Sequence, residues 1–211
     1  MATRKVFSDD TLSALICMNP GWTRDIPMQV QVRLFPGITP AYEFGANGKG
    51  SGRGRGAPVL DLYRAEEIAP GLMDERIWGC KIYNAKRRVP TAPIVTTGKQ
   101  EHVQTVIDAA ERGTSIPMLV LCRIGDQWFQ AVYDLGALIR RFGVQPAHKG
   151  RGKGRGQGHP VSMGESHVTY QPRIGPRKVY TYWNISVNIS RAGIAWEQIS
   201  SLANVDLNRF P

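Results

Sequence analysis

Hydrophobic and polar residues alternate along much of the chain, which is the pattern of half-buried β-strands. The longest alternating segment is KVYTYWNISVNIS (178–190), in which Val179, Trp183 and Ile185 share one face and Tyr182 belongs to the other. We expect the first face to lie in the core and the second to be open. Shorter runs predict further strands over residues 28–35, 58–63, 77–85, 92–97, 118–124 and 127–135.

Helical periodicity is confined to fewer segments. In KQEHVQTVIDAAERG (99–113), Val103, Val106 and Ile107 share one face, and Gly113 provides a C-terminal stop. The segment SDDTLSALICMNP (8–20) has a suitable N-cap serine and ends in proline, which predicts a short helix. Two more helices are expected, over residues 135–143 and, closing the chain, 192–205.

These elements predict a mainly β (α+β) fold. We expect one domain over residues 1–211, built as an antiparallel β-sheet or an OB-like barrel with a few short helices and two long basic Gly-rich loops. Gly125-Asp126 predicts a tight hairpin between two of the strands. DIPMQVQVR (25–33) resembles SIPMLVLCR (115–123). Either the domain is a pseudo-repeat of residues 25–97 and 115–190, or two short strands are alike by chance.

Positive charge is concentrated in two glycine-rich tracts. The net charge is +10, and the tracts GKGSGRGRG (48–56) and KGRGKGRGQG (149–158) contain only basic charges. Glycine lets a backbone approach phosphates closely, and Lys and Arg neutralise them, so the tracts are expected to bind nucleic acid. The alternative is that they are solvated loops without a ligand. Their cations are Lys49, Arg53, Arg55, Lys149, Arg151, Lys153 and Arg155.

The open face of segment 178–190 carries two tyrosines, Tyr180 and Tyr182, two residues apart. Aromatic rings beside cations suit unpaired bases, which stack on them whatever their sequence. The alternative is that these rings pack under a helix or at a subunit contact. The same face continues with a row of hydrogen-bonding groups, Asn184, Ser186 and Asn188. Three cations lie at one end of the segment: Arg173, Arg177 and Lys178.

A second strand, over residues 77–85, has a related pattern. Alternation places Trp78 inward and Tyr83 outward, and the strand runs directly into a basic cluster. We expect this cluster to contact phosphates; the alternative is an ordinary solvated strand end. The cluster consists of Lys86, Arg87 and Arg88.

No motif in the sequence indicates catalysis, a metal or a cofactor. The segment GANGKGSG lacks the spacing of a phosphate-binding loop. The histidines are scattered without metal-ligand spacing, at His102, His148, His159 and His167. The cysteines form no CxxC motif and lie in apolar surroundings, which predicts buried, reduced thiols at Cys17, Cys80 and Cys122.

Together these features predict a non-catalytic protein that coats single-stranded DNA or RNA with little sequence preference and forms a homo-oligomer. The alternative is a viral coat or nucleocapsid protein that packages a nucleic-acid genome, because both would combine a β-rich core with basic loops. The polar start and the lack of a long apolar run predict a soluble protein inside the cell, in cytoplasm or nucleus, or in the virion if viral, with no membrane partner.

Overall fold

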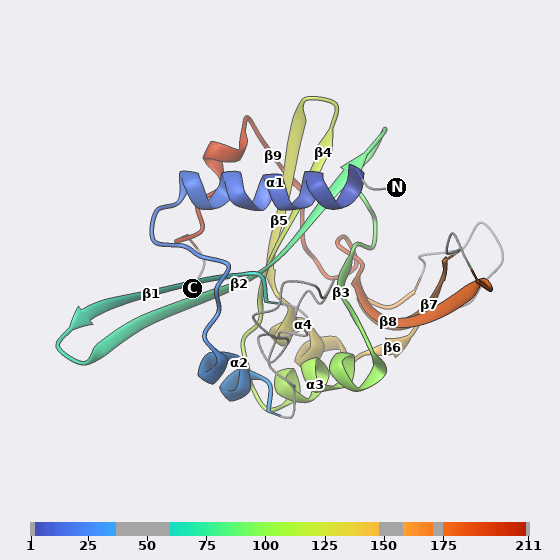
Figure 1. Ribbon diagram of the computed structural model, residues 1–211, viewed down its shortest axis with the longest axis horizontal. Helices are drawn as coiled ribbons and strands as arrows, with labels where there is room; N and C mark the ends of the chain where they lie inside the picture. Colours follow the sequence, from blue (N-terminus) through green and yellow to red (C-terminus); the bar gives the residue numbers. More distant parts are fainter. Residues whose placement is uncertain (1–2, 37–59, 148–157, 171–174, 210–211) are drawn as a thin grey trace.

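Two mixed β-sheets form the framework of the computed structural model, which describes residues 3–36, 60–147, 158–170 and 175–209 (Figure 1). The seven cations of the glycine tracts and Arg173 lie outside the described residues. Within the described part, the first sheet has the order β1-β2-β4-β5-β9, with β1 at Leu62–Ala69, β2 at Leu72–Ala85, β4 at Pro117–Ile124, β5 at Gln127–Asp134 and β9 at Glu197–Ile199. The second has the order β3-β8-β7-β6, with β3 at Ile94–Gly98, β8 at Lys178–Val187, β7 at Val161–Tyr170 and β6 at Gln145–Pro146.

Each sheet is antiparallel except for one parallel pair, β2 with β4 and β6 with β7. A parallel pair needs a crossover connection. Between β2 and β4 the chain supplies it through β3, in the other sheet, and helix α3, Gln100–Glu111. The prediction of a mainly β fold is therefore confirmed. The described strands differ from the expected antiparallel sheet or barrel in that they form two mixed sheets, each with one parallel pair, and do not make a closed barrel.

The first sheet is covered on both faces, which creates two apolar clusters. On β4, Met118 and Val120 belong to cluster 1, whereas Leu119 and Leu121 belong to cluster 2. Cluster 1 also contains residues of α3, of α4 (Leu135–Phe142) and of the second sheet. Cluster 2 is completed by helix α1, Thr3–Met18, and by the C-terminal segment that follows β9, with its 3-10 turn Leu202–Asn204. Figure 1 shows α1 lying across one side of the first sheet and α3 with α4 on the other.

Several predicted elements are confirmed. Helix α3 occupies the predicted segment 99–113, and Gly113 follows it with a φ of 101°. The hairpin at Gly125-Asp126 joins β4 to β5 in antiparallel register. Helix α4 and strands β2, β3 and β8 lie within two residues of expectation at most of their ends, although β2 begins five residues earlier than expected.

The segment 28–35 was expected to be a strand but forms helix α2, Met28–Leu34. Its buried residues are Val30, Gln31 and Phe35, whereas Val32 is exposed. Gln31 and Phe35 are four positions apart and therefore lie on the same side of a helix, whereas a strand would bury alternate residues. The similar stretch 115–123 contributes to strand β4, so the two stretches differ in secondary structure.

The expected closing helix over 192–205 is also wrong. Gly193 has a φ of 76°, which is not helical, and the chain then extends into β9. Gln130 of β5 pairs with Glu197 of β9. The segment is thus used to cover the edge of β5, which would otherwise leave its hydrogen-bonding groups unpaired.

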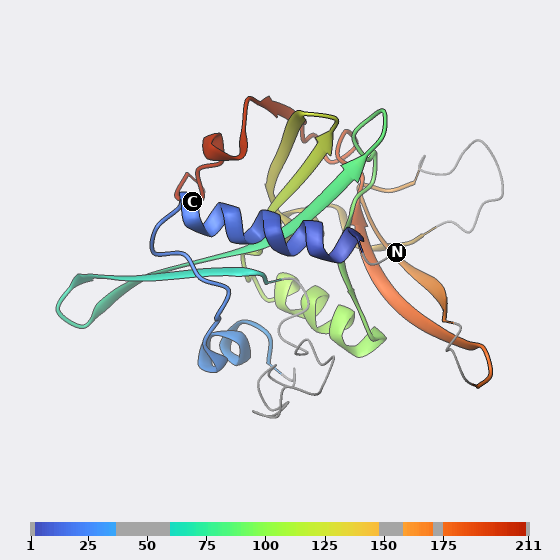
Figure 2. The same ribbon diagram turned by 45° about the horizontal axis from the view of Figure 1, so that its top comes forward.

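Two β-ribbons extend from the body at opposite ends of its longest axis (Figures 1 and 2). The β1–β2 ribbon turns at Pro70-Gly71, and Gly71 has a φ of 76°, as the third position of a type II turn requires. The β7–β8 ribbon pairs all ten residues of each strand. Strand β7 was not predicted, because residues 164–167, between Met163 and Val168, contain no apolar side chain and therefore show no alternation of apolar and polar residues.

Candidate functional site

The β7–β8 ribbon carries the predicted aromatic site. Ile185 and Val187 are buried in cluster 1, and Trp183 packs against it, as expected for the inner face. Beyond Trp183 the ribbon leaves the body, so Val179 is 60% exposed although it belongs to the same face. On the other face, Tyr182 is 37% exposed. Of the predicted open face, Tyr182 is thus partly exposed, and on the opposite face Val179 is exposed as well.

The side chains of Lys178 and Tyr180 lie outside the described part of the ribbon, although both residues belong to β8. In register, Lys178 stands opposite Tyr170 and Tyr180 stands opposite Val168. Tyr170 is a position that the sequence analysis missed, because it ends a strand that was not predicted. Arg177 is exposed and precedes β8 directly.

Cross-strand hydrogen bonds occupy most of the polar groups expected to face a ligand. The Asn184 side chain is buried and donates to Ser166 Oγ at 2.8 Å. The hydroxyls of Ser162 and Ser186 lie 3.0 Å apart. Asn188 is buried, and its Oδ1 atom accepts hydrogen bonds from the hydroxyl of Ser190 and from Arg191 N. The expected row of ligand-binding groups is thus used to hold the two strands and the following turn together.

The basic cluster after β2 is exposed. Lys86, Arg87 and Arg88 follow Ala85, which pairs with Ile124 at the end of β4. One neighbouring cation, Arg123, was not singled out from the sequence; it lies 3.2 Å from Asp126 Oδ1 and 5.9 Å from the centre of the Trp128 ring.

Tyr83 does not present the open ring that was predicted. Its ring packs against cluster 1, and its hydroxyl donates a hydrogen bond to Ile94 O at 2.7 Å. The alternation of β2 was assigned correctly, because Trp78 and Cys80 are buried in cluster 2. The assumption that failed is that the opposite face would be free, since α3, α4 and the second sheet cover it.

The two candidate clusters lie on different sheets. Only the segment that follows Lys86–Arg88 reaches the inner end of β8, where Val187 N donates to Pro93 O and Ile189 N donates to Thr91 O. Tyr182 lies five residues further out, which corresponds to about 16 Å along a strand. The structure therefore does not gather them into one pocket: Lys86–Arg88 follow β2 of the first sheet, whereas Tyr182 belongs to β8 of the second.

Both glycine tracts are flanked by residues that contact cluster 1. Phe35 is buried in that cluster, and Leu60 packs against it on the other side of the first tract. Beside the second tract, Ala147 N donates to Met163 O at 2.7 Å, and Val161 is buried in the cluster. The segments that flank the two tracts therefore contact the same apolar cluster, although the tracts are about a hundred residues apart in the sequence.

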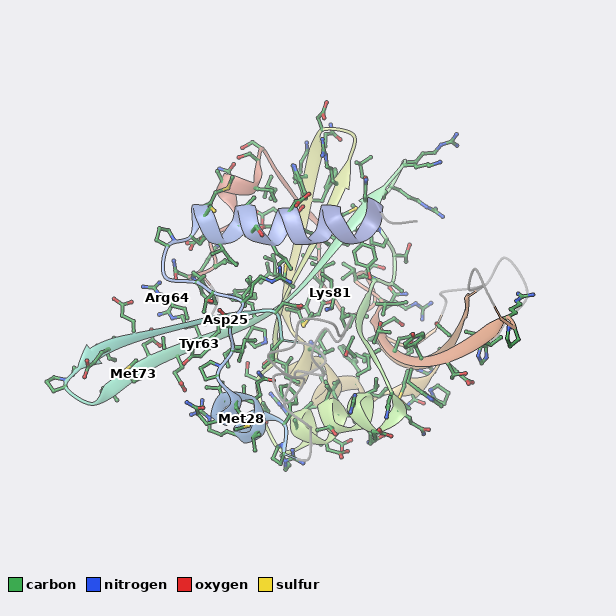
Figure 3. The ribbon with its side chains drawn as sticks, in the orientation of Figure 1. Asp25, Met28, Tyr63, Arg64, Met73 and Lys81 are labelled. Carbon is green, nitrogen blue, oxygen red and sulfur yellow. The ribbon has the colours of Figure 1, made fainter. Side chains whose placement is uncertain are left out.

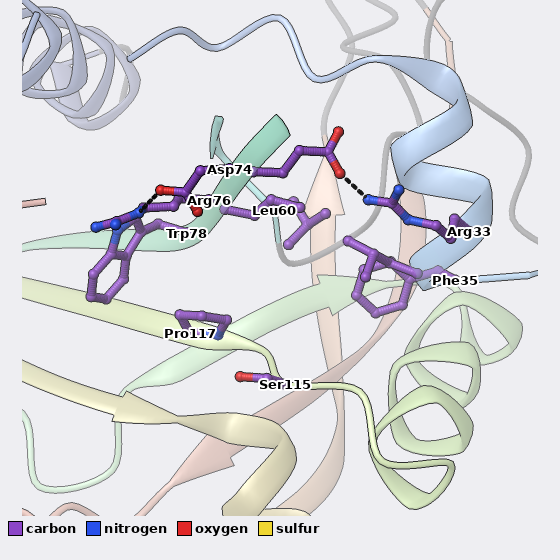
Figure 4. Close-up of a pocket in the computed structure, with 11 residues that line it drawn as sticks. Arg33, Phe35, Leu60, Asp74, Arg76, Trp78, Ser115 and Pro117 are labelled. Atoms are coloured by element: carbon purple, nitrogen blue, oxygen red, sulfur yellow. Dashed lines mark hydrogen bonds and ion pairs between the residues drawn. The ribbon is translucent and has the colours of Figure 1, made fainter. Parts of the chain in front are cut away.

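A cavity of about 380 Å³ lies between α2, the base of the β1–β2 ribbon and the start of β4 (Figure 4). Phe35 and Leu60 form part of its apolar wall. Its charges are paired: Arg33 binds Glu75, and Arg76 Nε lies 2.9 Å from Asp74 Oδ2. The Arg33 guanidinium holds the pKa of the Glu75 carboxyl below its ordinary value, against the opposing effect of burial.

The described residues contain no group of three or more His, Cys, Asp or Glu side chains that could hold a metal ion.

A second cavity, of about 260 Å³, lies between β5, β9 and the C-terminal segment. Its polar lining includes Glu197, whose carboxylate accepts a hydrogen bond from Gln130 at 2.9 Å. Burial raises the pKa of the Cys80 and Cys122 thiols. Cys17 is exposed, so the prediction that all three thiols are buried is wrong for this one.

Comparison with protein-family models, with curated proteins and with solved structures found no match to this chain. Of the helices in the described segments, none combines the length and the apolar character needed to cross a membrane.

Proposed function

We propose that the protein binds single-stranded nucleic acid without catalysis and with little sequence preference. The observation that carries the proposal is the β7–β8 ribbon, which leaves the core and exposes Tyr182, with the exposed Arg177 about 16 Å away at the start of the same strand. An exposed ring on a narrow ribbon can stack on a base, and neighbouring cations can contact the phosphates on either side.

The location of the charge supports the same function. The two tracts contain seven Lys and Arg residues without an acid, on a chain with a net charge of +10. Each phosphate contact releases counterions, which drives binding regardless of base sequence. The flanks of both tracts lie on cluster 1, and the exposed cations Lys86–Arg88 follow β2 beside the end of β4.

A preference for single strands follows from Tyr182. Charge alone favours a duplex, because a duplex has the higher charge density. Stacking on Tyr182 needs an exposed base face, and a duplex hides the faces of its bases. The proposed site therefore combines a charge term that any nucleic acid satisfies with a stacking term that only unpaired bases satisfy.

The test measures the affinity for an oligothymidylate over a range of salt concentrations, with the matching duplex as competitor. Replacing the seven tract cations with Gln should flatten the dependence of log K on log salt by about 0.7 for each lost phosphate contact. The Tyr182→Ala variant should bind the single strand about 5- to 150-fold more weakly, whereas Tyr182→Phe should bind like the wild type, because stacking uses the ring.

A charge-matched control separates local contacts from overall charge. Lys86, Arg87 and Arg88 changed together to Gln should weaken binding more than the same change at Lys99, Arg112 and Arg191, which are exposed elsewhere. Equal losses for both triple variants would show that only total charge matters. Equal or tighter binding of the duplex by the wild type would refute the single-strand site.

A further inference from the structure

The cavity between β5, β9 and the C-terminal segment has an apolar wall formed by the first sheet. Trp78, Leu119 and Val132, from the adjacent strands β2, β4 and β5, line it. Trp78 and Leu119 are buried, whereas Val132 is 37% exposed, so the cavity is open to solvent beside Val132. An apolar cavity of about 150 Å³ takes up benzene, and this one, of about 260 Å³, has room for a flat molecule of two fused rings.

The C-terminal segment forms another wall and is fixed to the body. Val205 and Leu207 line the cavity and are buried. Trp78 Nε1 donates to Leu207 O at 2.9 Å, and the Arg64 guanidinium donates to Asn208 Oδ1. Figure 3 shows Arg64 on the side of the β1–β2 ribbon that faces α1. The walls are therefore in place before a ligand arrives, and the polar lining adds Asn204, Asp206 and Arg209.

A buried amide and a carboxylate converge on this cavity. Gln130 on β5 stands directly opposite Glu197 on β9, so the two side chains lie on the same face of the sheet. Gln130 is only 7% exposed, and its Nε2 atom donates to Glu197 Oε2 at 2.9 Å. Within the described residues this is the one hydrogen bond that the Gln130 side chain makes. Because burial of an incompletely bonded amide is costly, the remaining capacity of Gln130 points to a polar ligand.

The pair presents an ordered set of hydrogen-bonding atoms. Glu197 Oε1 and Oε2 are acceptors, and Gln130 Nε2 beside them is a donor that keeps a second N–H for a ligand. Cytosine presents the same order, acceptor, acceptor and donor, along its Watson–Crick edge. Guanine is complementary to it, because its N2 and N1 atoms donate and its O6 atom accepts. The other common bases satisfy at most two of the three atoms at once.

From this arrangement we infer that the cavity binds guanine, with the Watson–Crick edge on Glu197 and Gln130 and the rings against Trp78 and Leu119. The guanine can belong to a free nucleoside or nucleotide, or to an unpaired position of a single strand, whose bases proteins read by the same edge. The proposed site at Tyr182 reads no base and belongs to the second sheet. The inference therefore goes beyond the proposed function and does not rest on it.

Isothermal titration calorimetry of the full chain with guanosine tests the inference. Inosine, which lacks only the 2-amino group, and adenosine are the comparison ligands. Guanosine should form a one-to-one complex, and the other two should bind about 10- to 150-fold more weakly, which is the effect of one hydrogen bond to a charged group. The absence of saturable guanosine binding would overturn the inference, as would equal affinities for guanosine and inosine.

Two variants separate the hydrogen bonds from the cavity itself. Glu197 is exposed, and Glu197→Gln, which replaces an acceptor by a donor, should weaken guanosine binding at least about tenfold. Val132→Trp fills the cavity and should abolish binding with the polar groups intact. Glu111→Gln is the charge-matched control on α3, on the other side of the sheet, and should bind like the wild type. Wild-type affinity in either cavity variant would overturn the inference, and thermal unfolding verifies that each variant is folded.

Competition distinguishes the two sources of guanine. An oligothymidylate with one central guanosine and a plain oligothymidylate are each added to the guanosine complex. Displacement by the first strand alone assigns the cavity to an unpaired base, and displacement by neither assigns it to a free nucleoside or nucleotide. Displacement by the plain strand would overturn recognition of the guanine edge. Because the Tyr182 site is tested with oligothymidylate, which contains no guanine, its failure and the failure of this inference are separate results.

Discussion

Replacing Asp134 should destabilise the joint between β5 and α4. Asp134 ends β5 and is the N-cap of α4. Its Oδ1 atom accepts two backbone hydrogen bonds of 2.8 Å, from Gly136 N in α4 and from Ile116 N before β4. The joint is tight, because a Cβ on Gly136 would lie 2.1 Å from Thr114 O. One carboxylate oxygen therefore links the start of α4 to the start of β4.

The magnitude follows from these two bonds. Loss of an N-cap costs about 0.5–2 kcal/mol. Ile116 is buried, and leaving its N–H without an acceptor costs a further 1–3 kcal/mol or so. We expect Asp134→Ala to lower the free energy of unfolding by about 2–4 kcal/mol. Asp134→Asn keeps an acceptor oxygen in place, so its loss should be less than half of that.

Urea unfolding followed by tryptophan fluorescence measures the effect. With a typical slope of about 2 kcal/mol per M, Asp134→Ala should lower the midpoint by roughly 1–2 M. Asp126→Ala is the control, because the Asp126 side chain is fully exposed at the β4–β5 turn and its loss should leave the midpoint unchanged. The reasoning fails if Asp134→Ala matches the wild type, or if Asn is as harmful as Ala at this position.

Three further predictions concern other parts of the fold. A thiol reagent should modify only Cys17 in the folded protein and all three cysteines after unfolding, as mass spectrometry will show, because burial raises the pKa of the Cys80 and Cys122 thiols; rapid modification of Cys80 would contradict this. The Arg33–Glu75 pair should stabilise the fold above pH 4.5, the ordinary pKa of the carboxyl, and lose this effect as the pH falls through the lower folded pKa. The small stability difference between wild type and Glu75→Gln should then vanish in acid, and a difference that grows on acidification would be the opposite result. Leu207→Ala should cost about 2–5 kcal/mol in urea unfolding, because Leu207 is buried in cluster 2 and its carbonyl accepts a hydrogen bond from Trp78 Nε1 at 2.9 Å; a cost below about 1 kcal/mol would show that the C-terminal segment does not hold the core.

Local pattern alone was sufficient for several elements. The spacing of Val103, Val106 and Ile107 and the stop at Gly113 define α3. The short connection at Gly125-Asp126 leaves β4 and β5 little choice except to pair. The alternation of segment 178–190 also predicted which face of β8 enters the core. In each case the signal comes from residues within a few positions of one another, and a turn or a single periodicity determines the result.

Where the sequence analysis failed, the deciding contact is distant in the sequence. Segment 28–35 alternates like a strand, yet no described strand pairs with it, and it packs as a helix with Val30 and Phe35 buried. Segment 192–205 was expected to be a helix, but the open edge of β5 draws Glu197–Ile199 into the sheet. Hydrogen bonds to a strand more than sixty residues away outweigh a weak local preference.

The same division holds for the candidate site. The amino-acid sequence by itself determined where the positive charge lies and which residues alternate along β2 and β8. Only the tertiary structure decided which of those faces are available: Tyr83 is covered by cluster 1 and Asn184 is bound to Ser166, whereas Tyr182 and Val179 stand on a ribbon that extends past the core. The physical reason is that side-chain direction is a local property of the backbone, whereas exposure depends on what the rest of the chain packs against it.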